Sequence, residues 1–370
     1  MHLLGEEKPV ASEHILGEEP QRNQANGGKA GTSEQMKARP TMQDVAQRAG
    51  VSLKTVSRVV NQEPRVNQET RIRVEEAIRS LGFRRNDIAR SLRQGQTSLT
   101  VGLVIEDIAN PFYSHLARGV EQVAQRHHHM LIISNSEENP QREREMVNAM
   151  LRRRVSGLLI VPAGRDHSYL KSEMRLGTQV IFVDRPPTNL EVDTVLLDSY
   201  SGTHAAIEHF LNRGHRRIGL ICGDPSVHTG AGRVGAYRAV LKEWGVPLDE
   251  SLLCFGCDAP ARAEAAVQRL LALPNPPTAL FATNNQISIA SLRALRSSPR
   301  RLAFIGFDDF ELAEMLPTPV TVIAHDPAKM GRQAAELLFA RLAGDDRPPQ
   351  HILLPTKLIV RGSSEIPPMW

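Results

Sequence analysis

The feature that most constrains this fold is a series of short apolar runs that recur from residue 100 onward. Nearly continuous Val, Ile and Leu segments alternate there with stretches of helical periodicity. Because strands buried on both faces read as unbroken apolar runs, this alternation predicts an α/β fold of parallel sheets covered by helices. The runs are VGLVIED, MLIISN, GLLIVPA, VIFVD, TVLLD, RIGLICGD, TALFATN, LAFIGFDD and VTVIAHD.

Most of these runs end in a polar residue. Ligands of open parallel sheets bind outside the carboxyl ends of the strands, so this position predicts a site for a small polar ligand. Asp and Asn also cap the helices that follow strands, and we expect several of these residues to be caps alone. The eight residues are Asp107, Asn135, Asp184, Asp198, Asp224, Asn284, Asp308 and Asp326.

Positive charge is concentrated in one part of the chain. Residues 41–96 carry eleven Lys or Arg against six Asp or Glu, a surplus of five, whereas the whole 370-residue chain has a net charge of +4. The remainder is therefore close to neutral. A compact basic module on a neutral body indicates a polyanionic partner for that module. A solvated charged face is the alternative, and charge alone does not separate the two.

The chain carries no signal for a membrane or an oxidising compartment. It has no run of eighteen apolar residues, and MHLLGEEKPV has acidic residues where a signal peptide needs a basic start. Three cysteines make no disulfide framework. We therefore expect a cytoplasmic protein without a membrane partner.

Residues 42–62 place their apolar side chains in two short groups separated by Gly50. One helix would give an uninterrupted stripe, so the break predicts a helix-turn-helix unit in which Ser52 caps the second helix. That helix would present Leu53, Lys54, Thr55, Ser57 and Arg58 outward. In a major groove, Lys or Arg reads guanine and hydroxyls hold phosphates. A plain packing motif is the alternative.

A third helix and a linker complete this region. Asn67 is the expected N-cap of the third helix and Gly82 its stop. Its expected apolar positions are Ile72, Val74, Ile78 and Leu81. The helix expected over 88–94 is too short to be stable alone. There Leu92 lies beside Arg90 and Arg93, a composition that suits a minor-groove wedge or a flexible linker.

Other candidate chemistry is weak. Cys254 and Cys257 have Cys-x-x-C spacing, but no second ligand pair accompanies them, so we expect ordinary reduced thiols. The consecutive His127–His129 would spread around a helix end. We expect no catalytic residue, no metal site and no cofactor. The alternatives are an α/β redox protein or enzyme with a fused DNA-targeting module, and a soluble sugar-binding protein, which the basic module disfavours.

Seven segments spread over roughly residues 41–363 form a joint pattern. They are TMQDVAQRAGVSLKTVSRVVNQEPRVNQETRIRVEEAIRSLGFRRNDIARSLRQGQT, GLVIEDIANPFYSHLARGVE, NSEENPQREREMVNAMLRRRVSGLLIVPA, VDRPP, GHRRIGLICGD, GFDDFELAEMLPTPVTVIAHDPAKMGRQAAELLFARLAG and LPTKLIVRGSS. Together they resemble the lactose/galactose-repressor family of bacterial transcription regulators.

The resemblance implies a nucleoid-associated transcription regulator, most simply a repressor, that binds a pseudo-palindromic double-stranded DNA operator as a homodimer or tetramer. A small ligand (a sugar, sugar derivative or nucleoside-like molecule) would bind between two lobes of a periplasmic-binding-protein-like body. The implied parts are a disordered extension (1–40), a headpiece (41–86), a hinge helix (87–96), a body (97–363) and a tail (364–370). Within the body, 97–196 and 321–343 would form the first lobe, and 197–320 and 350–363 the second.

The resemblance also implies site residues. DNA contacts would come from Thr41, Ser52, Leu53, Lys54, Thr55, Ser57, Arg58, Asn61, Ala89, Arg90 and Leu92, with Leu92 as the wedge. Effector contacts would come from Asp107, Phe112, Tyr113, Asp184, Arg185, Arg233, Asn285 and Asp308. The chain departs from the family pattern at Asn285, where Asp is usual, and at Ala236, where Gly is usual. The Asn285 change alters the usual clamp on ligand hydroxyls.

Overall fold

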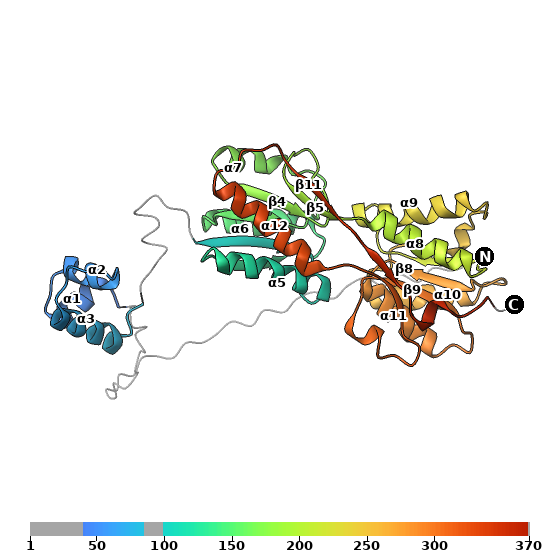
Figure 1. Ribbon diagram of the computed structural model, residues 1–370, viewed down its shortest axis with the longest axis horizontal. Helices are drawn as coiled ribbons and strands as arrows, with labels where there is room; N and C mark the ends of the chain where they lie inside the picture. Colours follow the sequence, from blue (N-terminus) through green and yellow to red (C-terminus); the bar gives the residue numbers. More distant parts are fainter. Residues whose placement is uncertain (1–39, 85–98, 369–370) are drawn as a thin grey trace, which may run out of the picture. The chain divides into compact units, whose positions relative to one another are not determined.

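The protein is described by a computed structural model that covers residues 40–84 and 99–368 (Figure 1). The chain divides into two compact units, with the division after Asn86. We call the first unit the headpiece and the second the body. The extension predicted to be disordered and the predicted hinge helix, with Ala89, Arg90 and Leu92, lie outside the described residues, apart from residue 40.

The headpiece consists of three helices, α1 (Met42–Ala49), α2 (Leu53–Val60) and α3 (Gln68–Leu81). The predicted break is present, because Gly50 takes a left-handed conformation (φ 63°) that ends α1. Ser52 and Asn67 cap α2 and α3 as predicted, and Gly82 ends α3. The helices enclose a small core of Val45, Ala46, Ala49, Val56, Val59, Val74 and Ala77.

One apolar position of α3 was predicted wrongly. Ile72 is 45% exposed, and Ala77 takes part in the core instead. The buried residues Val74 and Ala77 are three positions apart, which places them on one face of the helix. Ile72 lies two positions before Val74, so its side chain points away from that face.

The body contains two six-stranded sheets, and all nine predicted runs form strands in them. The first sheet has the order β11-β5-β4-β3-β1-β2 and the second β12-β10-β9-β8-β6-β7. The first comprises β1 (Thr100–Ile105), β2 (Met130–Asn135), β3 (Gly157–Ile160), β4 (Gln179–Val183), β5 (Thr194–Leu197) and β11 (His351–Leu354). The second comprises β6 (Ile218–Ile221), β7 (Leu253–Cys254), β8 (Ala279–Ala282), β9 (Ala303–Phe307), β10 (Thr321–Ala324) and β12 (Lys357–Ile359).

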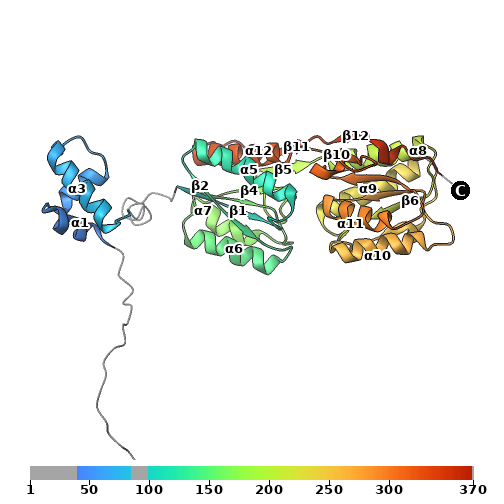
Figure 2. The ribbon, with the colours of Figure 1, turned by 90° about the horizontal axis from the view of Figure 1, so that it is seen from below.

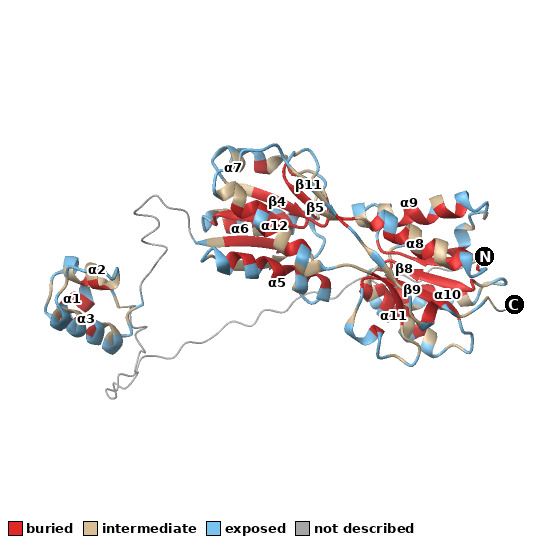
Figure 3. Cartoon of the chain, in the orientation of Figure 1, coloured by how far each residue is buried: buried red, intermediate tan, exposed pale blue. Residues whose placement is uncertain are grey.

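Strand pairing is parallel except at one edge. β12 pairs antiparallel with β10, and the other pairs in both sheets are parallel. Most central strands are buried along their whole length, as Figure 3 shows, which explains their unbroken apolar sequences. The predicted α/β fold of parallel sheets behind a helical N-terminal unit is therefore confirmed.

Helices cover both faces of each sheet. In the first lobe, α5 (Pro111–Arg126) and α12 (Pro327–Leu342) lie on one side, and α6 (Pro140–Arg152) lies on the other (Figure 2). In the second lobe, α8 (Ser199–Asn212) packs with α9 (His228–Glu243), and α10 (Pro260–Leu271) packs with α11 (Asn285–Arg296). Short helical segments complete the body at α7 (Lys171–Arg175), Ser168–Leu170, Glu250–Leu252, Glu311–Ala313 and Gly362–Ser364.

Two glycines permit the close packing of α5 against α12. A Cβ at Gly119 would lie 2.1 Å from the carbonyl oxygen of Ala328, and one at Gly331 would lie 2.0 Å from that of Leu116. Both contacts are with backbone, which cannot move aside without separating the helices. The absence of a Cβ at Gly119 and Gly331 therefore allows α12 to pack directly on α5 in the first lobe.

Two predicted lobe boundaries are wrong. β10, assigned with 321–343 to the first lobe, pairs with β9 in the second sheet. β11, assigned with 350–363 to the second lobe, pairs with β5 in the first sheet. The chain thus passes between lobes after β5, after β10 and after β11. The described part of the predicted tail also packs on the second lobe, where Ser364 is fully buried and Ile366 lies against the core.

Both sheets place their third strand beside the first on the side opposite the second, as β2-β1-β3 and β7-β6-β8. In open parallel sheets, the point at which the strand order reverses in this way is where ligands bind, outside the carboxyl ends of the strands. None of the described helices is long and apolar enough to cross a membrane.

Candidate functional site

The outward face of α2 carries an exposed leucine and two cationic side chains, of which Lys54 is unpaired among the described residues. Leu53 is 49% exposed, and Lys54 beside it is exposed too. Within the described residues Lys54 has no hydrogen bond or ion pair, so its ammonium is available to a partner. Arg58, one turn further, lies 3.7 Å from Glu63 in a loose ion pair. A short helix with an unpaired lysine and a loosely paired arginine on one face suits a major groove.

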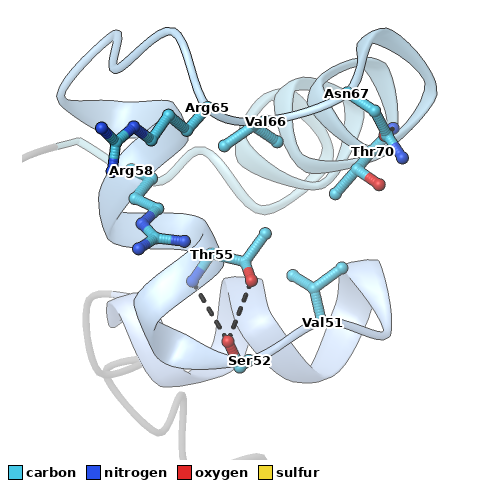
Figure 4. Close-up of a pocket in the computed structure, with 8 residues that line it drawn as sticks. All are labelled: Val51, Ser52, Thr55, Arg58, Arg65, Val66, Asn67 and Thr70. Atoms are coloured by element: carbon cyan, nitrogen blue, oxygen red, sulfur yellow. Dashed lines mark hydrogen bonds between the residues drawn. The ribbon is translucent and has the colours of Figure 1, made fainter.

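A hollow of about 380 Å³ opens beside this face (Figure 4). Its lining residues are Val51, Ser52, Thr55, Arg58, Arg65, Val66, Asn67 and Thr70. The hollow lies at the start of α2 and the start of α3, since Ser52 and Asn67 are their N-caps. Helix N-termini attract anions, and two arginines line the same hollow. This geometry fits a phosphate group.

Sequence reasoning missed three polar members of this hollow. Arg65, Asn67 and Thr70 were not among the predicted DNA contacts, although Asn67 was recognised as a cap. Its Oδ1 accepts the backbone N–H of Thr70 at 2.8 Å. The signal was available in principle, because a cap beside an arginine marks an anion-binding helix start.

Five predicted DNA contacts also form local hydrogen bonds within the headpiece: Thr41, Ser52, Thr55, Ser57 and Asn61. Thr41 forms a capping box with Asp44, whose carboxylate accepts the Thr41 backbone N–H at 2.7 Å. Ser52 Oγ lies 2.9 Å from Thr55 Oγ1 and accepts the Thr55 backbone N–H at 3.2 Å. Asn61 donates to Ser57 Oγ at 3.4 Å. These bonds order the side chains but leave the residues at the surface of the headpiece.

In the body, the two aspartates that directly follow β4 and β9 have a strained backbone conformation. Asp184 has φ 69° and Asp308 has φ 66°, a left-handed conformation that residues other than Gly rarely adopt. Both residues are buried. Strain of this kind persists where surrounding structure imposes it, and it concentrates at binding sites.

The second lobe builds a polar cluster around Asp308. The Nε2 atom of His325, which follows β10, lies 2.7 Å from Asp308 Oδ1, and the Asn285 backbone N–H donates to Asp308 Oδ2 at 3.3 Å. Arg233 on α9 donates to the Thr283 carbonyl at 2.7 Å, and its guanidinium lies 3.8 Å above the Phe307 ring. The residues that follow β8, β9 and β10 therefore meet with α9 at one place.

The first lobe builds a second cluster around Arg185. One guanidinium nitrogen donates to Glu138 Oε2 at 2.8 Å, and the other donates to both Glu138 and Glu106, the latter at 3.2 Å. Tyr113 Oη also donates to Glu106, at 2.7 Å. Both terminal nitrogens of Arg185 already donate hydrogen bonds to carboxylates. We therefore infer that Arg185 mainly orders the surrounding side chains and is not the main ionic contact of a ligand.

The carboxylates of the two clusters titrate differently. Burial and the neighbouring Glu138 raise the pKa of Glu106 to about 8. Burial likewise raises the pKa of Asp184, against the opposing charges of Arg185 and Arg233. Burial acts to raise the pKa of Asp308 as well, but His325 and Arg233 outweigh it and lower that pKa overall. Divergent pKa values within one group of acids are typical of functional sites.

Four buried polar atoms of these clusters have no hydrogen-bond partner among the described residues. They are Arg185 Nε, Arg233 Nε, Asn285 Oδ1 and His325 Nδ1. Buried polar atoms are normally satisfied, so several together indicate a place for a ligand or water. The edge of the Phe112 ring, 5.5 Å from the His325 ring, supplies an apolar wall. The arrangement suits a small polar molecule with an apolar face.

The structure brings seven of the eight predicted effector residues into these clusters. The exception is Asp107, whose carboxylate accepts the backbone N–H of Ala109 at 2.9 Å in its own loop. Asp198, Asn284 and Asp326 are N-caps, which confirms the expectation that several strand-terminal residues only cap. Sequence reasoning missed Glu106, Asn110, Glu138, Thr283, Phe307 and His325.

The cysteines do not support the redox alternative. All three are free and buried. Burial raises the pKa of Cys254, and raises that of Cys257 to about 12, aided by neighbouring Cys254 and Asp258. A reactive thiol needs a lowered pKa, so the surroundings of Cys254 and Cys257 do not favour thiol chemistry. Among the described residues, no group of three or more His, Cys, Asp or Glu could hold a metal ion.

Comparisons with known proteins agree with this architecture. The model of bacterial regulatory proteins of the lacI family matches residues 41–86, and the periplasmic binding protein-like domain matches 207–364. The HTH-type transcriptional regulator GalR of Salmonella typhimurium strain LT2 is 33% identical over 333 residues, covering 88% of this chain and 96% of GalR.

Solved structures show the same likeness. A lac repressor dimer bound to operator and the anti-inducer ONPF is 25% identical with a TM-score of 0.75, covering 88% of this chain and 99% of that one. A complex of the transcriptional regulator CelR with cellobiose is 30% identical with a TM-score of 0.65, covering 88% and 100%. These relatives are DNA-binding transcription regulators and not enzymes. The chain belongs to the lacI family of bacterial regulatory proteins.

Proposed function

We propose that this regulator represses transcription by reading an operator with α2 and that a small ligand in the body controls its affinity. The observation that carries the proposal is the hollow at the N-termini of α2 and α3, next to the uncommitted Lys54. A phosphate in the hollow would fix the headpiece on the DNA backbone. Lys54 and Arg58 would then lie along the major groove and read base edges.

The pseudo-palindromic operator would be bound by two copies of the chain. The similar lac repressor is a dimer on its operator. Two headpieces related by a two-fold axis read two half-sites, which makes operator symmetry follow from protein symmetry. The predicted wedge Leu92, with Ala89 and Arg90 beside it, stays a prediction from the sequence. Such a protein acts in the cytoplasm on the nucleoid.

The effector would bind where the clusters around Arg185 and Asp308 provide unpaired donors and acceptors. A sugar, sugar derivative or nucleoside-like molecule presents hydroxyls to Asp184 and Asp308 and an apolar ring face to Phe112. The similar CelR was solved with cellobiose, a polyhydroxylated ligand of this kind. A ligand with different affinity for two lobe arrangements shifts their populations and so changes operator affinity by the same free energy.

The domain assignment follows from these units. We propose a DNA-binding headpiece over 41–86, a linker over 87–96 and an effector-binding body from 97 onward. With the lobe corrections given above, the first lobe takes β1–β5, α12 and β11, and the second takes β6–β10 and β12. The predicted extension over 1–40 keeps no assigned role.

Selection of bound DNA from a random pool tests this function. The full-length protein should enrich a sequence with two related half-sites, and the enriched DNA should then be titrated against a panel of sugars and nucleosides. At least one ligand should change the affinity several-fold. Enrichment of unrelated sequences, with binding that depends on salt alone, would show non-specific DNA binding and contradict the proposal.

A further inference from the structure

A buried hydrogen bond joins the two lobes through a pair of asparagines. Asn285 Nδ2 donates to Asn110 Oδ1 at 2.9 Å, across 175 positions of sequence. Asn285 begins α11 in the second lobe, and Asn110 caps α5 in the first. Both residues are buried, at 2% and 8% exposure. A hydrogen bond shielded from water in this way is costly to break without replacement.

The orientation of this bond is fixed by the cap. Asn110 Oδ1 also accepts the Phe112 backbone N–H at 3.0 Å, so the atom that faces Asn285 is an acceptor. The partner must therefore be a donor, and the amide nitrogen of Asn285 supplies one. An aspartate at 285 would place a carboxylate oxygen against another acceptor. This requirement gives a physical reason for Asn at a position where Asp is usual in the family.

The other half of the Asn285 amide is open. Its Oδ1 is buried and has no hydrogen-bond partner among the described residues. The Asn285 backbone N–H meanwhile donates to Asp308, which holds α11 beside the second-lobe cluster. The Asn285 side chain thus donates through Nδ2 to the first lobe, while its Oδ1 remains available to accept a hydrogen bond at the candidate effector site.

We propose that Asn285 is an interlobe clasp: its bond to Asn110 stabilises the lobe arrangement seen here before any effector binds, and its free oxygen receives a donor group of the effector. Residue 285 is then a positioning residue that sets the lobe equilibrium. An effector hydroxyl or amino group that binds Oδ1 fixes the amide in the orientation the clasp needs. Effector binding and lobe contact reinforce each other through one side chain. The effector half rests on the function proposed above.

A further contact between the lobes lies at the surface. Arg165, in the loop after β3, donates to Ser226 Oγ at 2.7 Å in the loop after β6. The Glu143 carboxylate holds the Arg165 loop by accepting the backbone N–H groups of Ala163 and Gly164, at 2.6 and 3.1 Å. The Arg165–Ser226 bond is solvent-exposed, and exposed pairs contribute little. The buried asparagine pair should therefore dominate the equilibrium.

The same chemical change on the two asparagines gives opposite expectations. Asn285→Asp removes the donor and sets two acceptors against each other, so it should release the clasp. Asn110→Asp keeps the acceptor for both Phe112 and Asn285, so it should preserve the clasp. Asn285→Leu removes the donor without adding charge and should also release it. Asn284→Asp adds the same charge one residue earlier at a cap that accepts Asp equally well, so it serves as the control.

Distances between spin labels on the two lobes measure the outcome. Labels on Lys171→Cys and Lys242→Cys use exposed positions, one in each lobe, and the three native cysteines are buried. The full-length protein is measured without effector and without DNA, so a failed clasp and a failed regulator function remain distinguishable. Loss of one net hydrogen bond should lower the equilibrium constant between the wild-type lobe arrangement and the second population by roughly three- to tenfold.

The expected pattern is a wild-type distribution for Asn110→Asp and Asn284→Asp, and a second population for Asn285→Asp and Asn285→Leu. Wild-type distributions in both position-285 variants would overturn the proposal. So would a second population in Asn110→Asp, because the acceptor is retained there.

Discussion

Both terminal nitrogens of the Arg185 guanidinium donate hydrogen bonds to the carboxylate of Glu138. Arg185 is buried in this bidentate pair while Glu138 stays exposed to solvent, and the pair carries no sequence signature because its members lie 47 positions apart. Glu106 shares the same guanidinium, so two carboxylates compete for one cation. Burial first, and the neighbouring Glu138 second, raise the pKa of Glu106, so it is the acid of this group that ionises with difficulty.

The Glu106→Gln variant should flatten the pH dependence of stability. The pKa of Glu106 is raised from its ordinary 4.5 to about 8. A group with a raised folded-state pKa contributes stability that is fully present below its unfolded pKa and is lost as pH rises through its folded pKa. Wild-type protein should therefore lose stability between about pH 5 and pH 9, and the variant should lose less.

Urea unfolding at several pH values measures this difference. Glu121→Gln removes an exposed carboxylate from α5 and serves as the control, with the wild-type slope expected. Identical slopes for Glu106→Gln and wild type would show that Glu106 is ionised throughout, contrary to the prediction.

The Gly331→Ala variant should destabilise the first lobe. The added Cβ would lie 2.0 Å from the Leu116 carbonyl oxygen, which forces α5 and α12 apart. Overpacking of this kind costs about 1–3 kcal/mol of unfolding free energy. Gly232→Ala is the matched control, because a Cβ there meets nothing within 4 Å and the change should be neutral or stabilising by up to about 1 kcal/mol. Thermal unfolding of both variants measures the difference in stability. Equal stability of Gly331→Ala and Gly232→Ala would contradict the close packing of α5 against α12.

Lys54→Ala should relax sequence preference. An exposed lysine that reads a base edge contributes about 1–3 kcal/mol of discrimination at a cognate site. Titration of the selected operator and of point-substituted operators measures the loss. Arg79→Ala removes one charge from the last turn of α3 and controls for charge alone. Equal weakening by Lys54→Ala on all sequences would make Lys54 a phosphate contact instead.

Arg65→Ala should weaken binding to every sequence alike. The residue lines the hollow at the helix N-termini, where a phosphate and not a base would lie. Removing one phosphate contact should lower the slope of log affinity against log salt by about 1. A loss confined to particular base pairs would refute the phosphate role of the hollow.

The sequence predicted the elements of this fold well where local patterns decide them. Buried parallel strands, the glycine break at Gly50 and the caps Ser52 and Asn67 all have local signals, and all are present. The failures at β10 and β11 concern which sheet a short strand joins. That choice depends on pairing with strands far away in sequence, which no local pattern records.

The candidate site was predictable only in outline. Strand-terminal Asp184 and Asp308 were expected from the sheet and the family resemblance, but the contact of Asp308 with His325 was not. Glu138 resembles any loop glutamate, and Asn110 resembles any helix cap, until tertiary structure brings Arg185 and Asn285 to them. Such partners are set by contacts between distant segments and need coordinates to be found.

The central claim, that a ligand in the body controls operator affinity, is tested most directly by Asp184→Asn. The substitution keeps the shape of a buried side chain but removes the charge that would accept ligand hydroxyls. The affinity for the selected operator is measured with and without the ligand identified in the panel of sugars and nucleosides. Wild type and the variant are compared. We expect a several-fold ligand response in wild type, normal ligand-free operator binding in the variant, and a response that is lost or needs far more ligand. An unchanged ligand response in Asp184→Asn would contradict the account.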